Sequence, residues 1–376
     1  MTTFRDAMHA DQIAWRARHL PHVRGAGVWM GRPYEHILPR GAADENLWPG
    51  LRDGGVRPLE PWLAAEDVQP HKGRDNLLSS WTLCANLYFP FGEGPEARAL
   101  LAGFFRALTG LPVARVRAVA LEYALPAPHN PGTLLGEHDG KRGANQTSPD
   151  VAFELTLEDG REALVLTEVK FVEHSFYDCS GCKALSADQR RSTCWDLAHV
   201  LADPATRCAH AATRGRRYWD HLTGPMRQAN GGAGSRRCPA AMGGYQLFRQ
   251  QALAEALAHT TDLAAVVSSV AYDARNTGLL KSVSEVADLR TGWGPMFAGR
   301  AGFVVWSHQA WFRWVAQAEA APAWAADWLA WVGDRYGYAG EGGATPKNLQ
   351  SAQSDGSPTT SATCKPALQV QPGARP

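Results

Sequence analysis

Three residues in the middle of the chain have the types and spacing of a catalytic site, namely Asp150, Glu168 and Lys170. Two carboxylates held close together repel each other unless a cation lies between them, and oxygen ligands of this kind suit Mg²⁺. A neighbouring lysine can orient a water molecule, help to deprotonate it, or balance charge that develops on a phosphate. The combination indicates metal-assisted hydrolysis of a phosphodiester.

A β-hairpin would bring these three side chains together. The segment 151–171 begins with alternating apolar and polar positions and ends in a run rich in β-branched residues, so we expect two strands. Gly160 between them can occupy the left-handed position of a three-residue loop at little steric cost. Such a loop sets Asp150 opposite Glu168, with Lys170 on the same face. A two-residue loop would turn Asp150 away from Glu168.

The motif resembles that of the PD-(D/E)XK nuclease superfamily, which includes many restriction endonucleases. Pro149-Asp150 matches its first part, and Glu168-Val169-Lys170 matches its second part. The resemblance implies that Asp150 and Glu168 hold a catalytic Mg²⁺ ion and that Lys170 is the catalytic lysine. The large group of uncharacterised restriction endonucleases within this superfamily is the most similar in pattern.

Nucleases of this superfamily usually carry one more acidic residue before the first motif. Glu122 and Glu137 are the two candidates in this chain. We favour Glu122 as the additional catalytic acid, because a strand next to the hairpin can direct its side chain towards the site. The alternative interpretation of Glu122 is an ordinary surface glutamate.

The elements around the hairpin are expected in the order helix, strand, strand, strand, helix, strand. Sequence patterns place helices at 95–109 and 245–259, and strands at 113–125, 151–157, 164–171 and 262–272. This order matches the αβββαβ core of the superfamily. The expected fold class is therefore α/β (α+β), a restriction-endonuclease-like core with a mixed central sheet, a cysteine-rich insertion and added N- and C-terminal helices.

The expected domain organisation has four parts. They are an N-terminal helical and irregular wrap at 1–94, a nuclease core at 95–275 with an insertion at 173–244, C-terminal helices at 276–339, and a disordered tail at 340–376. The C-terminal helices are expected at 280–289 and 306–335. Trp324, Trp328 and Trp331 recur at helical spacing, which is more typical of a buried face than of a base-stacking surface.

Two segments contain polar residues that are expected to contact nucleic acid. Gln246 and Arg249 lie in the first turn of the helix after the insertion, on the stripe that faces the core. Lys141, Arg142 and Asn145 lie in the loop before Asp150 and could bind phosphate or base edges. A helix end that reaches solvent and a charged, solvated loop are the alternative interpretations.

Cysteines are concentrated after the hairpin. Cys179 and Cys182 form a CxxC pair, and Cys194 and Cys208 follow, with Cys238 beyond them. Four such thiolates can close a tetrahedral zinc site. The wide later gaps leave an iron-sulfur cluster and unligated thiols open as alternatives.

Composition limits the class of protein and its partners. The chain has 376 residues, 45% hydrophobic residues and a formal net charge of +1, so it can form a large core and has no overall attraction to polyanions. Nucleic-acid binding would need a local basic patch. Charged residues interrupt the first twenty positions, and no membrane-spanning run is evident, which favours a cytoplasmic protein.

The function that these patterns favour is a Mg²⁺-dependent nuclease acting on nucleic acid, with DNA as the first choice of substrate. A homodimer is left open. One alternative is a catalytically silent, zinc-stabilised module that binds nucleic acid or regulates a partner on the same fold. Another is an unrelated α/β protein in which the two motif parts coincide by chance.

Overall fold

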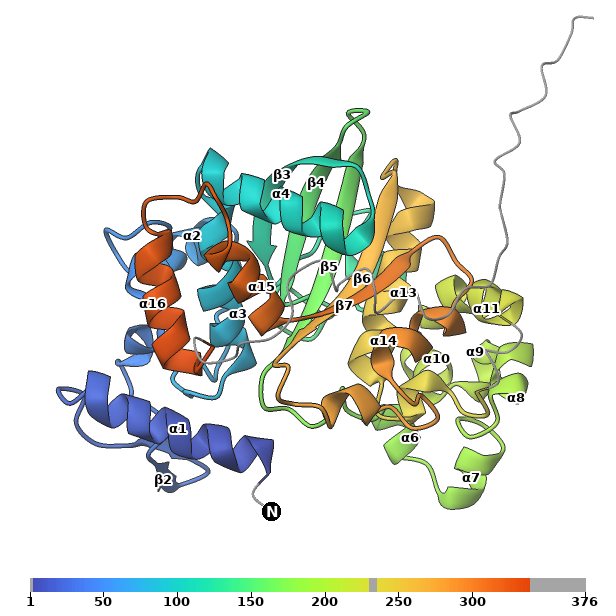
Figure 1. The fold of residues 1–376 in the computed structure, drawn as a ribbon. Coiled ribbons are helices and arrows are strands. Elements are labelled where there is room, and N and C mark those ends of the chain that lie inside the picture. The colour runs from blue at the N-terminus through green and yellow to red at the C-terminus, as the bar shows by residue number, and fades with distance from the viewer. Residues whose placement is uncertain (1–2, 230–234, 339–376) are drawn as a thin grey trace, which may run out of the picture. The chain divides into compact units, whose positions relative to one another are not determined.

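A five-stranded mixed sheet lies at the centre of the computed structural model, which describes residues 3–229 and 235–338 (Figure 1). Its strands, in spatial order, are β3 (Val113–Leu121), β4 (Val151–Leu157), β5 (Glu162–Lys170), β6 (Ala265–Tyr272) and β7 (Gly302–Ser307). The first three are antiparallel, whereas β6 pairs with β5 and β7 pairs with β6 in parallel. The expected mixed α/β class is confirmed.

The β4–β5 hairpin has the expected register. Gly160 adopts a left-handed φ of +83°, and the N–H of Leu157 donates to the carbonyl of Arg161 at 2.8 Å. The paired residues of the two strands continue this register, which sets Asp150 opposite Glu168. The three-residue loop is thereby confirmed, and the alternative with the two carboxylates on opposite faces is wrong.

Helices cover both faces of the sheet, and each face has its own hydrophobic cluster. Phe153 and Leu155 of β4 pack with helices α3 (Ser80–Tyr88), α4 (Pro95–Thr109), α15 (His308–Ala316) and α16 (Ala325–Tyr336). Ala152 of β4 and Leu166 of β5 pack instead with α13 (Tyr245–Thr260) and with the segment 173–244. Successive side chains of a strand point to opposite faces, so the hairpin contributes to both clusters.

Apart from α1 and α11, the remaining elements are short. In segment 173–244 they are α6 (Ser180–Lys183), α7 (Ala187–Arg191), α8 (Leu197–Ala202), α9 (Pro204–Arg207), α10 (Ala209–Arg214) and α11 (Tyr218–Gln228). Elsewhere they are α1 (Phe4–His19), β1 (Gly27–Trp29), β2 (Arg32–Tyr34), α2 (Leu59–Ala65), α5 (Pro131–Leu135) and α14 (Leu289–Gly292). No helix of the described residues is long and apolar enough to cross a membrane.

Some of the sequence-based bounds differ from those of the structure. β3 ends at Leu121, before the expected end at residue 125. The helix expected at 280–289 is absent, because its serines and aspartate favour turns, and only a short 3₁₀ turn and the start of α14 occur there. The helices expected within 306–335 are α15 and α16: Ser307 ends β7 and caps α15, and Pro322 lies between the two helices.

The expected stripe of C-terminal tryptophans is part of the core. Trp328 is completely buried, and Trp324 and Trp331 are partly buried against the same cluster. All described residues fall within one unit, Met1–Gly342. The four-part division remains a prediction, and the tail expected at 340–376 lies outside the described residues.

Candidate active site

Glu168 and Lys170 lie at the end of β5, on the face of the sheet that α13 covers. Both side chains are buried, and Lys170 Nζ donates to Glu168 Oε1 at 2.8 Å. Lys170 Nζ also donates to Oε1 of Gln246, in the first turn of α13, at 2.9 Å. The rings of Phe176 and Tyr177 lie 5.6 Å and 5.7 Å from Nζ. The ammonium group is therefore enclosed between a carboxylate, an amide and two aromatic faces.

Asp150 precedes β4 and lies directly across the hairpin from Glu168. Its Oδ2 accepts a hydrogen bond from the N–H of Val169 at 2.7 Å. This bond orients the carboxylate and leaves the second oxygen without a partner among the hydrogen bonds of the described residues. The hairpin thus brings together the three residues that the motif singles out.

Glu122 contributes a third acidic residue near the site, but it lies just beyond the end of β3 and not within the strand as expected. It follows the end of the strand and has a left-handed φ of +46°, with its N–H donating to the carbonyl of Asp150 at 3.1 Å. Arg142 holds this turn, because its Nε and Nη2 donate to the carbonyls of Glu122 and Leu121, each at 3.0 Å. Its Nη1 pairs with the carboxylate of Glu66 at 2.8 Å. Every nitrogen of the Arg142 guanidinium therefore has a protein partner.

Glu168 affects the ionisation of its two carboxylate neighbours, Glu122 and Asp150. Burial, and next the charge of Glu168, raise the pKa of Glu122 to about 8. Burial, followed by Glu168 and Glu122, raises the pKa of Asp150 well above its usual range. Burial alone would lower the pKa of Lys170, but Glu168, Glu173 and Asp150 together raise it. Full ionisation of the site is therefore unfavourable unless a cation binds, because one lysine does not neutralise three carboxylates.

Glu137, the other candidate for the additional acidic residue, is engaged in contacts that stabilise the surrounding loop and helices. It is buried, and it accepts hydrogen bonds from the N–H of Thr147 and from Tyr218 Oη at 2.7 Å. Arg249 Nη2 forms an ion pair with it at 3.2 Å, and Arg249 Nε donates to Thr147 Oγ1 at 3.0 Å. Of the two α13 residues expected at the site, Gln246 contacts Lys170, whereas Arg249 stabilises the loop before Asp150.

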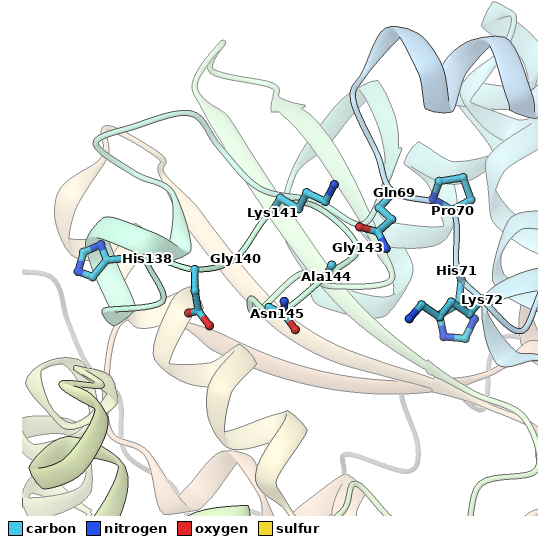
Figure 2. A pocket seen from close by; sticks show the side chains of 11 residues that line it. Gln69, Pro70, His71, Lys72, His138, Gly140, Lys141, Gly143, Ala144 and Asn145 are labelled. Carbon is cyan, nitrogen blue, oxygen red and sulfur yellow. The ribbon is translucent and has the colours of Figure 1, made fainter.

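Lys141 and Asn145 lie on a cleft of about 600 Å³. Figure 2 shows their loop facing a second segment that contributes His71 and Lys72. The two segments touch where the backbone of Gly143 packs on the carbonyl of Gln69, at a distance that a Cβ atom would not allow. The cleft therefore has lysine and histidine side chains on both of its walls.

The family of the chain is shown by a comparison with protein-family models. The model described as Restriction Endonuclease associating with ARP (REase-ARP) matches residues 8–337. The chain belongs to this family. The family's description indicates a restriction endonuclease, that is, a nuclease that acts on DNA. No curated protein and no solved structure matches the chain.

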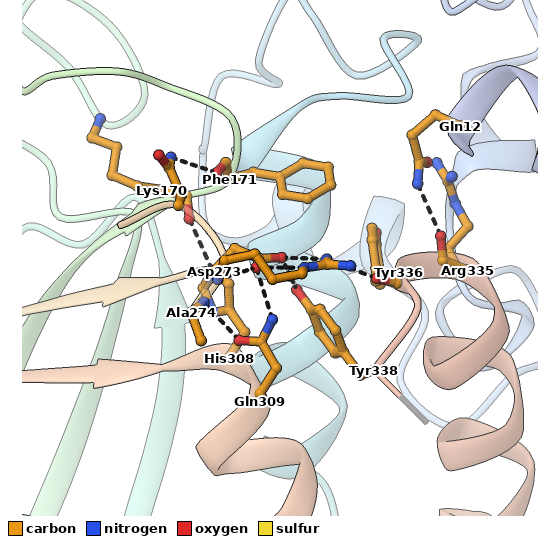
Figure 3. Close-up of polar contacts among 12 residues, drawn as sticks. Gln12, Lys170, Phe171, Asp273, Ala274, His308, Gln309, Arg335, Tyr336 and Tyr338 are labelled. Atoms are coloured by element: carbon orange, nitrogen blue, oxygen red, sulfur yellow. Dashed lines mark hydrogen bonds and ion pairs between the residues drawn. The ribbon is translucent and has the colours of Figure 1, made fainter. Parts of the chain in front are cut away.

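Sequence reasoning missed one buried residue that supports the site of this REase-ARP protein. Nε2 of His308 donates to the backbone carbonyl of Lys170 at 2.9 Å (Figure 3), so Nδ1 is the acceptor for Tyr88 Oη, also at 2.9 Å. Burial lowers the pKa of His308 to about 4. Because its partners come from β5 and α3, no local sequence pattern identifies this histidine.

Five cysteines of the REase-ARP chain surround a second, smaller cavity of about 20 Å³. They are Cys179, Cys182, Cys194, Cys208 and Cys238. Burial raises the pKa of Cys179 to about 11 and that of Cys238 well above the usual range. Among residues 3–229 and 235–338, no three cysteine, histidine or acidic side chains are already arranged as a metal site, here or beside Glu168.

Proposed function

We propose that this REase-ARP protein is a metal-dependent nuclease of the PD-(D/E)XK type that hydrolyses phosphodiester bonds of DNA. The observation that carries the proposal is the joint placement of Asp150, Glu168 and Lys170 by one hairpin, with Lys170 Nζ 2.8 Å from Glu168. A structural hairpin has no need for two facing carboxylates with a buried lysine beside them. The order of α4, β3, β4, β5, α13 and β6 along the chain is the order of this superfamily's core.

The donor set fits a divalent cation with a preference for oxygen. Asp150 and Glu168 would hold it, and Glu122 lies close enough to raise the charge of the set. Each of these groups is a carboxylate, and neither a thiol nor an imidazole is among them, which suits Mg²⁺ better than a softer metal. When bound, Mg²⁺ would supply charge neutralisation and polarise the phosphate.

Lys170 would act on the reacting phosphate or on the attacking water. Neighbouring carboxylates keep it protonated, and its contact with Gln246 fixes the direction of Nζ. A fixed ammonium group in a buried site stabilises developing negative charge without reorganisation. Gln246 is thus a positioning residue, and Arg142 positions Glu122 in the same sense.

DNA would enter along the cleft lined by Lys72, Lys141 and Asn145. Phosphate contacts from lysines position a duplex without reading its sequence, and an amide can reach base edges. Arg142 and Arg249, which the sequence also suggested as ligands of nucleic acid, are engaged with Glu66 and Glu137. We therefore assign substrate contact first to Lys141 and Asn145.

Cleavage of supercoiled and linear DNA with Mg²⁺, with Mn²⁺ and with EDTA tests the proposal. We expect cleavage that needs the metal and that Glu168→Gln reduces at least ~100-fold, because several kcal/mol of charge stabilisation are lost. Glu162→Gln, at the exposed start of β5, is the matched control and should cleave as the wild type does. If the wild type cleaves neither DNA nor RNA with any metal, the catalytically silent module replaces the nuclease.

A further inference from the structure

Five thiols that are spread over residues 179–238 converge on one small cavity on the α13 side of the sheet. Four of them are buried, and Cys208 is half-buried. Backbone hydrogen bonds hold the contributing segments together, since Cys238 N–H donates to the Cys194 carbonyl at 2.8 Å and Cys179 N–H to the Ala240 carbonyl at 2.9 Å. Backbone hydrogen bonds therefore help to keep the five cysteines close together.

The cavity suits one ion better than a water molecule. About 20 Å³ is enough for a single small species. A water would need two to four hydrogen-bond partners, whereas thiols, aromatic rings and alanines form most of the lining. An iron-sulfur cluster is larger than a single ion, so the volume favours zinc among thiolate-binding metals.

Two buried donors beside the cavity lack acceptors. Trp219 Nε1 and His210 Nδ1 are buried and have no hydrogen-bond partner among the described residues. His210 Nε2 is already an acceptor, for the N–H of Gly181 at 3.3 Å, which assigns the ring proton to Nδ1. Unpaired buried donors are costly, and a thiolate is a better acceptor than a thiol. Deprotonated, metal-bound sulfurs would therefore suit the surroundings better than five neutral thiols.

We propose that four of these five cysteines, with Cys179 and Cys182 as the CxxC pair, bind a structural zinc ion in this cavity. Binding would draw the sulfurs closer together than they now stand, by rotation of the cysteine side chains. The fifth thiol, from either Cys208 or Cys238, would remain beside the ion. Zinc would then add a cross-link to the apolar contacts that the short helices α6 to α10 make with the second hydrophobic cluster.

The cavity also borders the helix that reaches Lys170. Tyr245, the first residue of α13, lines the cavity and stacks on His210 with ring centres 5.5 Å apart. The next residue is Gln246, whose N–H donates to the carbonyl of Phe176 at 3.0 Å. Bound zinc would thus fix the first turn of α13. Its effect on catalysis, through Gln246 and Lys170, rests on the proposed nuclease function.

Metal analysis of the purified full-length wild type tests the site without any cleavage assay. We expect about one zinc per chain, and after replacement by Co²⁺ the absorption of a tetrahedral thiolate complex. Cys179→Ser and Cys182→Ser should lose the metal, whereas Cys84→Ala, which removes a buried thiol on α3, should keep it. Wild-type protein that contains no metal and takes up no Co²⁺ after reduction, or that contains iron and sulfide, would overturn the proposal.

Hydrogen exchange tests the link to α13 on the wild type alone. Removal of zinc by a chelator should raise the exchange rates of the Tyr245 and Gln246 amides by at least ~10-fold, because their bonds to the 173–177 segment open more often. The β4–β5 amides should not change. Equal protection with and without zinc would overturn the proposed ordering of α13, and neither result depends on whether the protein cleaves DNA.

Discussion

The β4–β5 hairpin and the segment 173–244 follow each other in the sequence, but different kinds of contact determine their structures. In the hairpin, one glycine at φ +83° sets the register, and alternation along the strands sets which side chains meet. In the segment 173–244, short helices contribute thiols to one cavity, and only contacts between distant residues hold them there. Local rules therefore specify the positions of Asp150, Glu168 and Lys170, and long-range contacts specify the cysteine cluster.

The largest expected effect is a loss of DNA cleavage without a loss of stability, caused by a substitution in the hairpin. Asp150→Asn should reduce DNA cleavage at least ~100-fold, because a ligand of the cation is lost. It should not lower the free energy of unfolding at pH 8, because Asp150 has a raised pKa and its charge is unfavourable there, while the amide can still accept from Val169. Cleavage rates and urea unfolding measure the two effects.

Asp159→Asn, in the exposed turn of the same hairpin, is the matched control for that variant. It should keep wild-type cleavage. A folded Asp150→Asn protein with wild-type activity would remove Asp150 from the site.

The second effect is a pH dependence of stability that arises from His308, the residue of α15 that binds the Lys170 carbonyl of the hairpin. Burial lowers the pKa of His308 from 6.5, its ordinary value and the one expected in the unfolded chain, to about 4 in the folded protein. Between these two pH values the unfolded chain binds a proton at His308 and the folded protein does not. Stability should therefore fall as the pH is lowered from about 6.5 to about 4, by up to ~3 kcal/mol, and this loss should level off below that range. Urea unfolding between about pH 7.5 and pH 4.5 measures the slope.

His308→Gln offers the comparison, because an amide can donate to the Lys170 carbonyl and accept from Tyr88 without titrating. The variant should show a shallower loss of stability over the same pH range. Identical slopes in the two proteins would show that His308 is not the titrating group.

The smallest effect tests the turn that sets the register. Gly160→Ala should destabilise the protein by ~1 kcal/mol, since an L-residue is strained at positive φ, while no atom lies within 4 Å of the added Cβ. Gly278→Ala is the control, because Gly278 has φ −62° and equally open surroundings. Thermal unfolding should rank Gly160→Ala below both Gly278→Ala and the wild type.

The same contrast explains how much the sequence could predict. Asp150, Glu168 and Lys170 were placed correctly because a turn residue and a two-residue period are local features. The geometry of Glu122 could not be predicted, since it depends on a left-handed turn that Arg142 holds from a distant loop. β7 was missed because its short apolar run borders a helix without an intervening loop.

Long-range partners account for the other differences. The sequence suggested Arg142 and Arg249 as ligands of nucleic acid, yet each has an acidic partner that no spacing rule reveals. The cysteine count suggested a cluster, but only the folded chain shows that Cys238 belongs to it.

The central claim is that Lys170 acts in a metal-dependent nuclease site formed by the hairpin. Its most direct test is the rate of Mg²⁺-dependent DNA cleavage by Lys170→Ala, measured beside Lys281→Ala, which removes an exposed lysine from the 3₁₀ turn after β6. We predict a loss of at least ~100-fold for Lys170→Ala and wild-type cleavage for Lys281→Ala. Wild-type cleavage by a folded Lys170→Ala protein would contradict the account.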